Sequence, residues 1–185
     1  MKKITELTEV RWRTVHYKDE YGNRERDTEE YKAKRPVKSV SAGPRFGHFF
    51  VDFIICQIIF YILQIAFLNL FKEYHDNYSL KTSLFLLNNI IVLIFYPSYY
   101  IISEHLWQKS PGKFLTKTIV IDEYGNKPEL GTIILRSIIR IVPFEPFSSL
   151  SDDFSYAWHD KWSKTWVVTE VELAEIKRLQ LEQSN

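Results

Sequence analysis

The sequence has a single cysteine, Cys56, which excludes a disulfide framework and any metal cluster built on several cysteines. It also lacks an excess of either charge, because 24 Lys and Arg are balanced by 23 Asp and Glu for a net charge of +1. Binding a nucleic acid through bulk charge would need a strong basic excess, so we expect no nucleic-acid partner. Aromatic residues make up 16% of the chain, which is too many for a disordered protein.

Two long stretches of the chain carry no formal charge. Half of the 24 Lys and Arg lie in residues 1–45, whereas residues 53–71 and 84–103 contain no Asp, Glu, Lys or Arg. A helix needs about 20 apolar residues to cross a hydrocarbon core of roughly 30 Å. A buried helix of a soluble protein normally has a polar stripe and rarely runs this long without a charge. We therefore expect two membrane-spanning helices, over residues 46–71 and 84–107.

Basic residues near the ends of the two spans predict their orientation. Residues 31–45 contain five Lys and Arg and no acid, and residues 108–121 contain three Lys and no acid. The connector, residues 72–83, has two Lys balanced by two acids. Because basic residues stay on the cytoplasmic side of a membrane, we expect a multi-pass protein with both termini in the cytoplasm. A cleaved signal peptide is not expected, since a long polar segment precedes the first apolar run.

Residues 130–142 form a third apolar segment, and it is too short to span. Arg136 and Arg140 lie one turn apart on one face of it, and Pro143 ends it. We expect an amphipathic helix that lies in the interface or re-enters between the spans. Its arginines would face either lipid headgroups or protein carboxylates. A longer third span that reaches Leu150 is left open.

The remaining segments indicate a few short elements. Residues 10–17 and 118–121 alternate as strands do, and each is followed by the turn sequence Glu-Tyr-Gly-Asn. Residues 164–169 also have a strand pattern, and we expect them to pair with residues 118–121. A short amphipathic helix is expected over residues 170–183.

These elements define one fold class. We expect an α-helical integral membrane protein with two transmembrane helices, an amphipathic or re-entrant helix and a small cytoplasmic β ribbon. Its three parts are a polar N-terminal segment, residues 1–38, a membrane domain, residues 39–169, and a C-terminal short helix or tail, residues 170–185.

A cluster of polar residues opens the first span. Arg45, His48 and Asp52 share one face of the predicted helix, and Asp52 lies inside the apolar layer. An ionised carboxylate there needs a partner or water. Asp52 is thus a candidate carrier of a proton or cation with His48 as a relay, or the structural partner of Arg136 or Arg140. For Arg45 we expect contact with lipid phosphate.

His159 and Asp160 form a second candidate site. Together with the acids at 152–153 they could suggest a metal site, but adjacency alone does not provide the spacing of a ligand set, so no metal is expected. The favoured role of Asp160 is to accept hydrogen bonds from Arg136 or Arg140.

Two further features have a structural and a functional interpretation. Lys113 follows a glycine, but the upstream glycine of a phosphate-binding loop is absent, so we expect Lys113 at lipid headgroups. A polar stripe on the second span, made of Asn89, Tyr96, Tyr100 and Ser103, could line a pathway or bond to a neighbouring helix.

Four motifs, taken in order along the chain, resemble the RDD family of membrane proteins. They are residues 42–52 with Arg45 and Asp52, then Ser110-Pro111-Gly112-Lys113, then Arg136 and Arg140, and finally Trp158-His159-Asp160-Lys161. The resemblance covers about residues 40–169. It implies a multi-span protein of the inner cell membrane, for which transport has been suggested, and it supplies no reaction.

Two functions remain open from the sequence. No nucleophile, base and orienting group converge, so we expect neither an enzyme nor a cofactor. The first hypothesis is a transporter, a homo-oligomer since two spans enclose no pathway, in which Asp52 alternates between a proton and an inorganic cation. The second is a noncatalytic membrane scaffold that uses the same charged residues as structural ion pairs, namely Arg45, Asp52, Arg136, Arg140 and Asp160.

Overall fold

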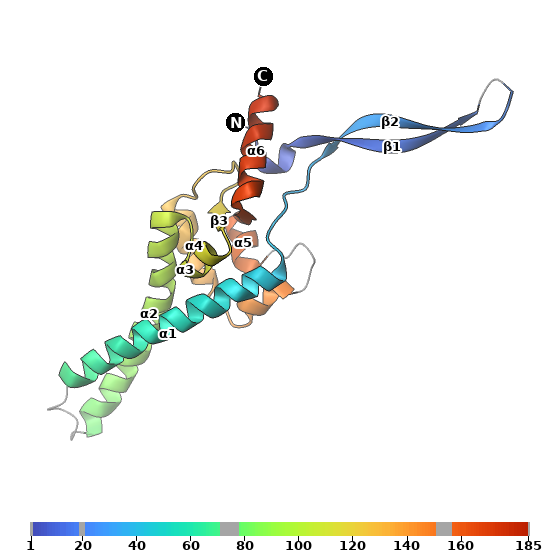
Figure 1. Ribbon diagram of the computed structural model, residues 1–185. Coiled ribbons are helices and arrows are strands. Elements are labelled where there is room, and N and C mark those ends of the chain that lie inside the picture. The colour runs from blue at the N-terminus through green and yellow to red at the C-terminus, as the bar shows by residue number, and fades with distance from the viewer. Residues whose placement is uncertain (1, 19–20, 71–77, 151–156, 185) are drawn as a thin grey trace.

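Two long helices form the largest part of the computed structural model. The structure describes residues 2–18, 21–70, 78–150 and 157–184. Helix α1 comprises Ala42–Leu70 and helix α2 comprises Tyr78–Trp107, so both begin a few residues before the predicted spans. The rings of Phe60 and Phe95 lie 6.5 Å apart where the two helices approach each other. Both helices extend to the same end of the molecule (Figure 1).

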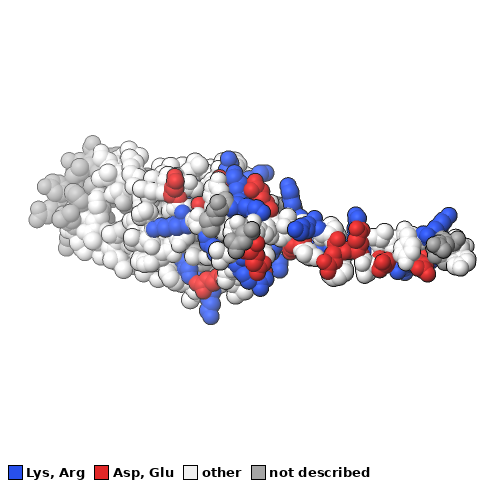
Figure 2. Space-filling model, turned by 90° about the horizontal axis from the view of Figure 1, so that it is seen from above, with Lys and Arg blue, Asp and Glu red and all other residues white. Residues whose placement is uncertain are grey.

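The rest of the chain covers little of either long helix. In the most apolar parts of Ala42–Phe67 and Phe85–Trp107, 11% and 6% of the residues are buried. The charged side chains gather away from the end of the molecule that these helices form (Figure 2). A core helix of a soluble protein would be covered on most sides. Both helices are therefore long and apolar enough to cross a membrane and present apolar side chains outward, as expected.

A small sheet and the C-terminal helix form a separate hydrophobic core. Strand β3, Thr118–Ile121, pairs antiparallel with strand β4, Trp166–Thr169, as predicted. Helix α6, Glu170–Glu182, follows directly, and the Thr169 hydroxyl caps it by accepting from the Glu172 amide at 3.2 Å. The core side chains come from distant parts of the sequence: Ile4, Leu7, Ile121, Val168 and Ile176.

The N-terminal segment forms a hairpin that extends away from the rest of the molecule (Figure 1). A single turn of 3-10 helix, η1, Ile4–Glu6, precedes strand β1, Thr8–Lys18, which pairs antiparallel with β2, Arg24–Lys34. The alternation over residues 10–17 predicted β1, but β2 was not predicted because nearly all its residues are polar. Glu20 of the expected turn lies outside the described residues.

Short helices lie on both sides of β3. Helix α3, Pro111–Leu115, precedes β3, and helix α4, Leu130–Ile139, is shorter than the predicted 130–142. The 3-10 helix η3, Glu145–Leu150, and helix α5, Trp158–Ser163, follow. A third span that reaches Leu150 therefore does not form in the part of the chain described, because the helix ends at Ile139, four residues before Pro143.

Candidate functional site

Asp52 is buried between α1 and the segment after α2. Its side chain is 1% exposed and accepts three hydrogen bonds, from the Tyr99 hydroxyl at 2.9 Å, the Ser110 hydroxyl at 2.5 Å and the Gly112 amide at 2.8 Å. No Lys or Arg among the described residues contacts it. The predicted pairing of Asp52 with Arg136 or Arg140 is therefore wrong, because neutral donors occupy both carboxylate oxygens.

Gly112 explains why α3 can lie so close to α1. A Cβ atom added at this glycine would lie 2.5 Å from the backbone oxygen of His48 and 3.1 Å from Oδ1 of Asp52. Real Cβ atoms essentially never approach another heavy atom so closely. The Ser-Pro-Gly-Lys motif thus brings two hydrogen-bond donors onto Asp52 through a contact that only glycine permits.

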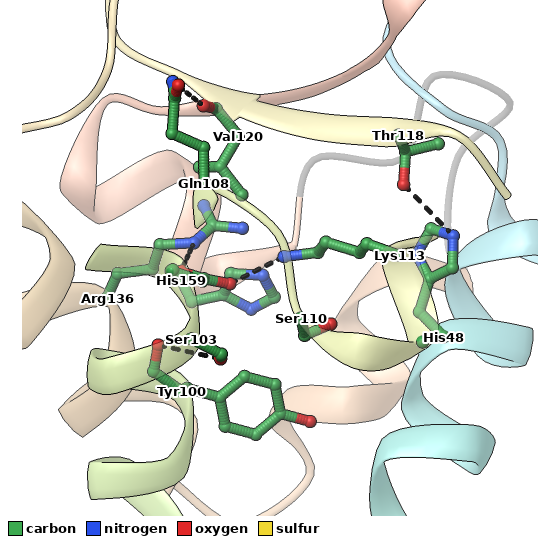
Figure 3. Close-up of polar contacts among 12 residues, drawn as sticks. His48, Tyr100, Ser103, Gln108, Ser110, Lys113, Thr118, Val120, Arg136 and His159 are labelled. Atoms are coloured by element: carbon green, nitrogen blue, oxygen red, sulfur yellow. Dashed lines mark hydrogen bonds and ion pairs between the residues drawn. The ribbon is translucent and has the colours of Figure 1, made fainter. Parts of the chain in front are cut away.

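Glu104 gathers three cations at the end of α2. Its carboxylate is 1% exposed and accepts from Nζ of Lys113 at 2.6 Å, Nε of Arg136 at 3.1 Å and Nη2 of Arg140 at 2.7 Å. The Lys113 and Arg136 side chains extend toward one another across this site (Figure 3). Glu104 was not among the residues predicted from the sequence. Glu104 is the first acid after the charge-free residues 84–103, and this position could have indicated a buried carboxylate.

One cation of this cluster, Lys113, lies away from its expected place. Lys113 is 4% exposed, so the prediction that it contacts lipid headgroups is wrong. Burial lowers the pKa of Lys113 to about 8, with further lowering by Arg136 and Arg140, while Glu104 opposes the shift. Arg140 also lies over the Tyr100 ring, with its guanidinium carbon 4.0 Å from the ring centroid.

Asp160 joins two arginines from different parts of the chain. It is fully buried on α5 and accepts from Nη1 of Arg45 on α1 and from Nη1 of Arg136 on α4. Burial acts to raise the pKa of Asp160, but Arg136 and Arg45 hold it well below its usual range. The expected acceptor role of Asp160 toward Arg136 is present.

Arg45 is turned into the protein. Its side chain donates through Nε to the Val40 carbonyl oxygen at 2.8 Å and through Nη2 to the Ser39 hydroxyl at 2.6 Å, besides the Asp160 pair. Arg45 is only 8% exposed and binds these protein groups, so the predicted contact with lipid phosphate is wrong. Arg45 instead fastens the start of α1 to α5 and to the residues just before α1.

His48 and His159 lie apart from each other within the cluster (Figure 3). Nε2 of His48 contacts the Thr116 hydroxyl and lies 3.3 Å from the Thr118 hydroxyl. His159 contacts the Glu145 carboxylate through Nδ1, and burial lowers its pKa to about 4 despite the opposing effect of Asp160.

The metal-site interpretation finds no support in the described part of the chain. There, no three His, Cys, Asp or Glu side chains are grouped so that they could hold a metal ion. The acids at 152–153 lie outside the described residues.

A cavity of about 70 Å³ lies among these groups. Polar and charged side chains contribute much of its lining: Arg45, His48, Asp52, Tyr96, Tyr100, Lys113, Arg140, Glu145 and His159. Such a volume accommodates a few water molecules or a small ion. Nη1 of Arg140 is buried and has no hydrogen-bond partner within the described ranges. A water molecule in the cavity would satisfy such a donor.

The structure brings all seven candidate residues into one cluster. Those residues are Arg45, His48, Asp52, Arg136, Arg140, His159 and Asp160. With Glu104, Lys113 and Glu145, the cluster contains four cations and four carboxylates. The cations are Arg45, Lys113, Arg136 and Arg140, and the carboxylates are Asp52, Glu104, Glu145 and Asp160. The cluster is therefore neutral when both histidines are neutral.

The polar stripe of the second span is divided between two environments. Tyr100 and Ser103 are buried at the cluster, whereas Asn89 is exposed, and its amide donates to the Phe85 carbonyl oxygen of its own helix at 2.7 Å. Only the end of this stripe that lies near the cluster faces the rest of the protein.

The long apolar helices, joined at one end by a buried polar cluster, define a small helical membrane protein. The model of the RDD family matches residues 39–169, and the chain belongs to this family. No curated protein and no solved structure matches it.

Proposed function

We propose that this chain is a noncatalytic membrane scaffold that crosses the bilayer twice and fastens a small cytoplasmic unit to both spans. The ion-pair cluster is the observation that carries this proposal. Glu104 on α2 binds Arg136 of α4, Arg136 binds Asp160 of α5, and Asp160 binds the arginine at the start of α1. Four elements are thus tied by one continuous chain of buried contacts, which suits a rigid support.

The proposed orientation rests on the basic residues beside the cluster. Residues 31–41 just before α1 and residues 108–121 just after α2 contain basic residues and no acids. Both lie at the end of the spans where the cluster lies. The positive-inside rule then puts this end, with both termini, in the cytoplasm of a cell membrane.

The β1–β2 hairpin is the proposed site for a protein partner. An isolated two-stranded hairpin is marginally stable in water, and here Val10 and Trp12 are 57% and 63% exposed on one face. At its base, Arg35 holds it to α6 through a buried bidentate pair with Glu172, at 2.6 and 2.8 Å. A firm base that carries two exposed apolar side chains fits a surface that a partner covers.

Affinity purification in mild detergent tests this proposal. The full chain should recover one recurrent protein, and Trp12→Ala should lose it because the largest apolar side chain of the hairpin face is gone. Phe144→Ala is the matched control, since Phe144 is 76% exposed but lies far from the hairpin in sequence. Recovery of no recurrent protein, or equal recovery with Trp12→Ala, would contradict the scaffold proposal.

A transport function is the second candidate, and one observation favours it. Asp52 lines the internal cavity without contacting any Lys or Arg in the described part of the chain, so its charge is balanced only at longer range. A proton or small inorganic cation could neutralise such a carboxylate. Vesicles containing the protein should then show ion-driven pH changes that Asp52→Asn abolishes. Undiminished flux in that variant would remove this candidate.

A further inference from the structure

Helix α1 carries polar side chains on two opposite faces. The face with Arg45, His48 and Asp52 is buried against the rest of the chain. At about 100° per residue, a second face gathers aromatic and amide side chains within a narrow arc. They are Phe46, Phe50, Phe53, Gln57, Tyr61 and Gln64, and they are called the outer α1 face here.

The outer α1 face is uncovered. Phe46, Phe50 and Tyr61 are 55%, 53% and 64% exposed, Gln57 is also exposed, and Gln64 is half-buried. Gln57 lies near the middle of the apolar stretch Ala42–Phe67, too deep for its short side chain to reach the polar surface of a bilayer.

The glutamine amides have no partner within the described structure. Neither Gln57 nor Gln64 makes a hydrogen bond to another described residue. Asn89 on α2 behaves differently, because its amide bonds to the Phe85 carbonyl oxygen of its own helix. An amide left in hydrocarbon without a partner is unfavourable, so the outer α1 face requires a polar partner at the same depth.

We propose that the outer α1 face is a homodimer interface in which two copies of α1 pair across a two-fold axis along the membrane normal. Copies inserted in the same orientation place Gln57 opposite Gln57 at equal depth, with Tyr61 and Gln64 beside them. Each amide has donors and an acceptor, so the surface is complementary to itself. The stacked rings of Phe46 and Phe50 extend the contact toward the end of the helix.

Association in vesicles of phosphatidylethanolamine and phosphatidylglycerol tests the dimer. Fluorescently labelled copies are counted by photobleaching while the protein is diluted in lipid. Most particles should contain two copies. The double variant Gln57→Leu with Gln64→Leu should dimerise roughly tenfold more weakly, as expected for losing a few interhelical hydrogen bonds. Asn89→Leu is the control and should leave dimerisation unchanged. One copy per particle at every dilution, or equal weakening by Asn89→Leu, would overturn the proposal.

Cysteine cross-linking gives a second test, because it detects the dimer directly and does not depend on a variant that weakens it. Cys56 points to the buried side at 5% exposure, so the natural chain should not cross-link on oxidation. Gln57→Cys, made with Cys56→Ser, should form a covalent dimer because the two thiols meet at the axis. If the variant elutes as a folded species in detergent and still forms no covalent dimer in vesicles, the interface is also refuted.

Discussion

Replacement of Glu104 by glutamine tests the ion-pair cluster most directly. The substitution keeps the size of the side chain and removes the charge that Lys113, Arg136 and Arg140 share. Three buried cations would then face an amide whose NH2 group repels at least one of them. Breaking a buried ion pair by removing one partner costs about 3–5 kcal/mol. We expect the free energy of unfolding to fall by about this amount, a large fraction of the roughly 5–15 kcal/mol typical of folded proteins.

Thermal unfolding of the purified protein in detergent measures this effect. Glu170→Gln is the matched control, because Glu170 pairs with Lys109 at the surface and its side chain is 50% exposed. That control should leave the melting temperature unchanged. Adding Lys113→Met to Glu104→Gln should cost less than the sum of the two single changes, since one unpaired cation is removed. A melting temperature of Glu104→Gln within error of the natural chain would refute the reasoning.

Two further predictions concern the packing of α3 and the acid response. Gly112→Ala should lower the free energy of unfolding by roughly 1–3 kcal/mol, because the new Cβ meets a backbone oxygen of α1. Gly131→Ala is the control and should not lower it, because a Cβ there meets no other atom. Equal melting temperatures of the two variants would contradict this prediction. The pKa of His159 is lowered to about 4 from an ordinary 6.5. As pH falls, His159 is therefore protonated in the unfolded chain before it is protonated in the folded chain. The free energy of unfolding then decreases between about pH 6.5 and about pH 4. His159 contributes roughly 3 kcal/mol to this loss, so the loss should be smaller by about that amount in His159→Gln. Melting curves across this pH range that fall in parallel for both proteins would show that His159 is not the group responsible.

Much of the secondary structure could be read from local patterns. The absence of charge over residues 53–71 and 84–103 predicted the two long helices, and alternation predicted β1 and the pairing of β3 with β4. Strand β2 escaped prediction because its polar residues have no alternating pattern. It is held by the ladder it forms with β1 and not by burial of its own side chains.

The candidate site was predictable by residue, but of its predicted pairings the one between Asp160 and Arg136 is present and that of Asp52 is not. Charges in an apolar setting must find partners, and on that basis Arg45, Asp52 and Asp160 were singled out. The partners were chosen wrongly for Asp52, and Glu104 was missed. An arginine fits any carboxylate that the fold brings near, and nothing local to either residue shows which one it will be.

The sequence alone therefore determined which segments are long and apolar enough to cross a bilayer. Helix length and the run of uncharged residues are local properties, and they can be compared directly with the thickness of the hydrocarbon core. Tertiary structure decided how the charges are shared. It turned the arginines of α4 inward onto Glu104 and Asp160, and it left three neutral donors for Asp52. That choice depends on contacts between segments far apart in the chain, where distance, burial and a single glycine at position 112 set which groups can meet.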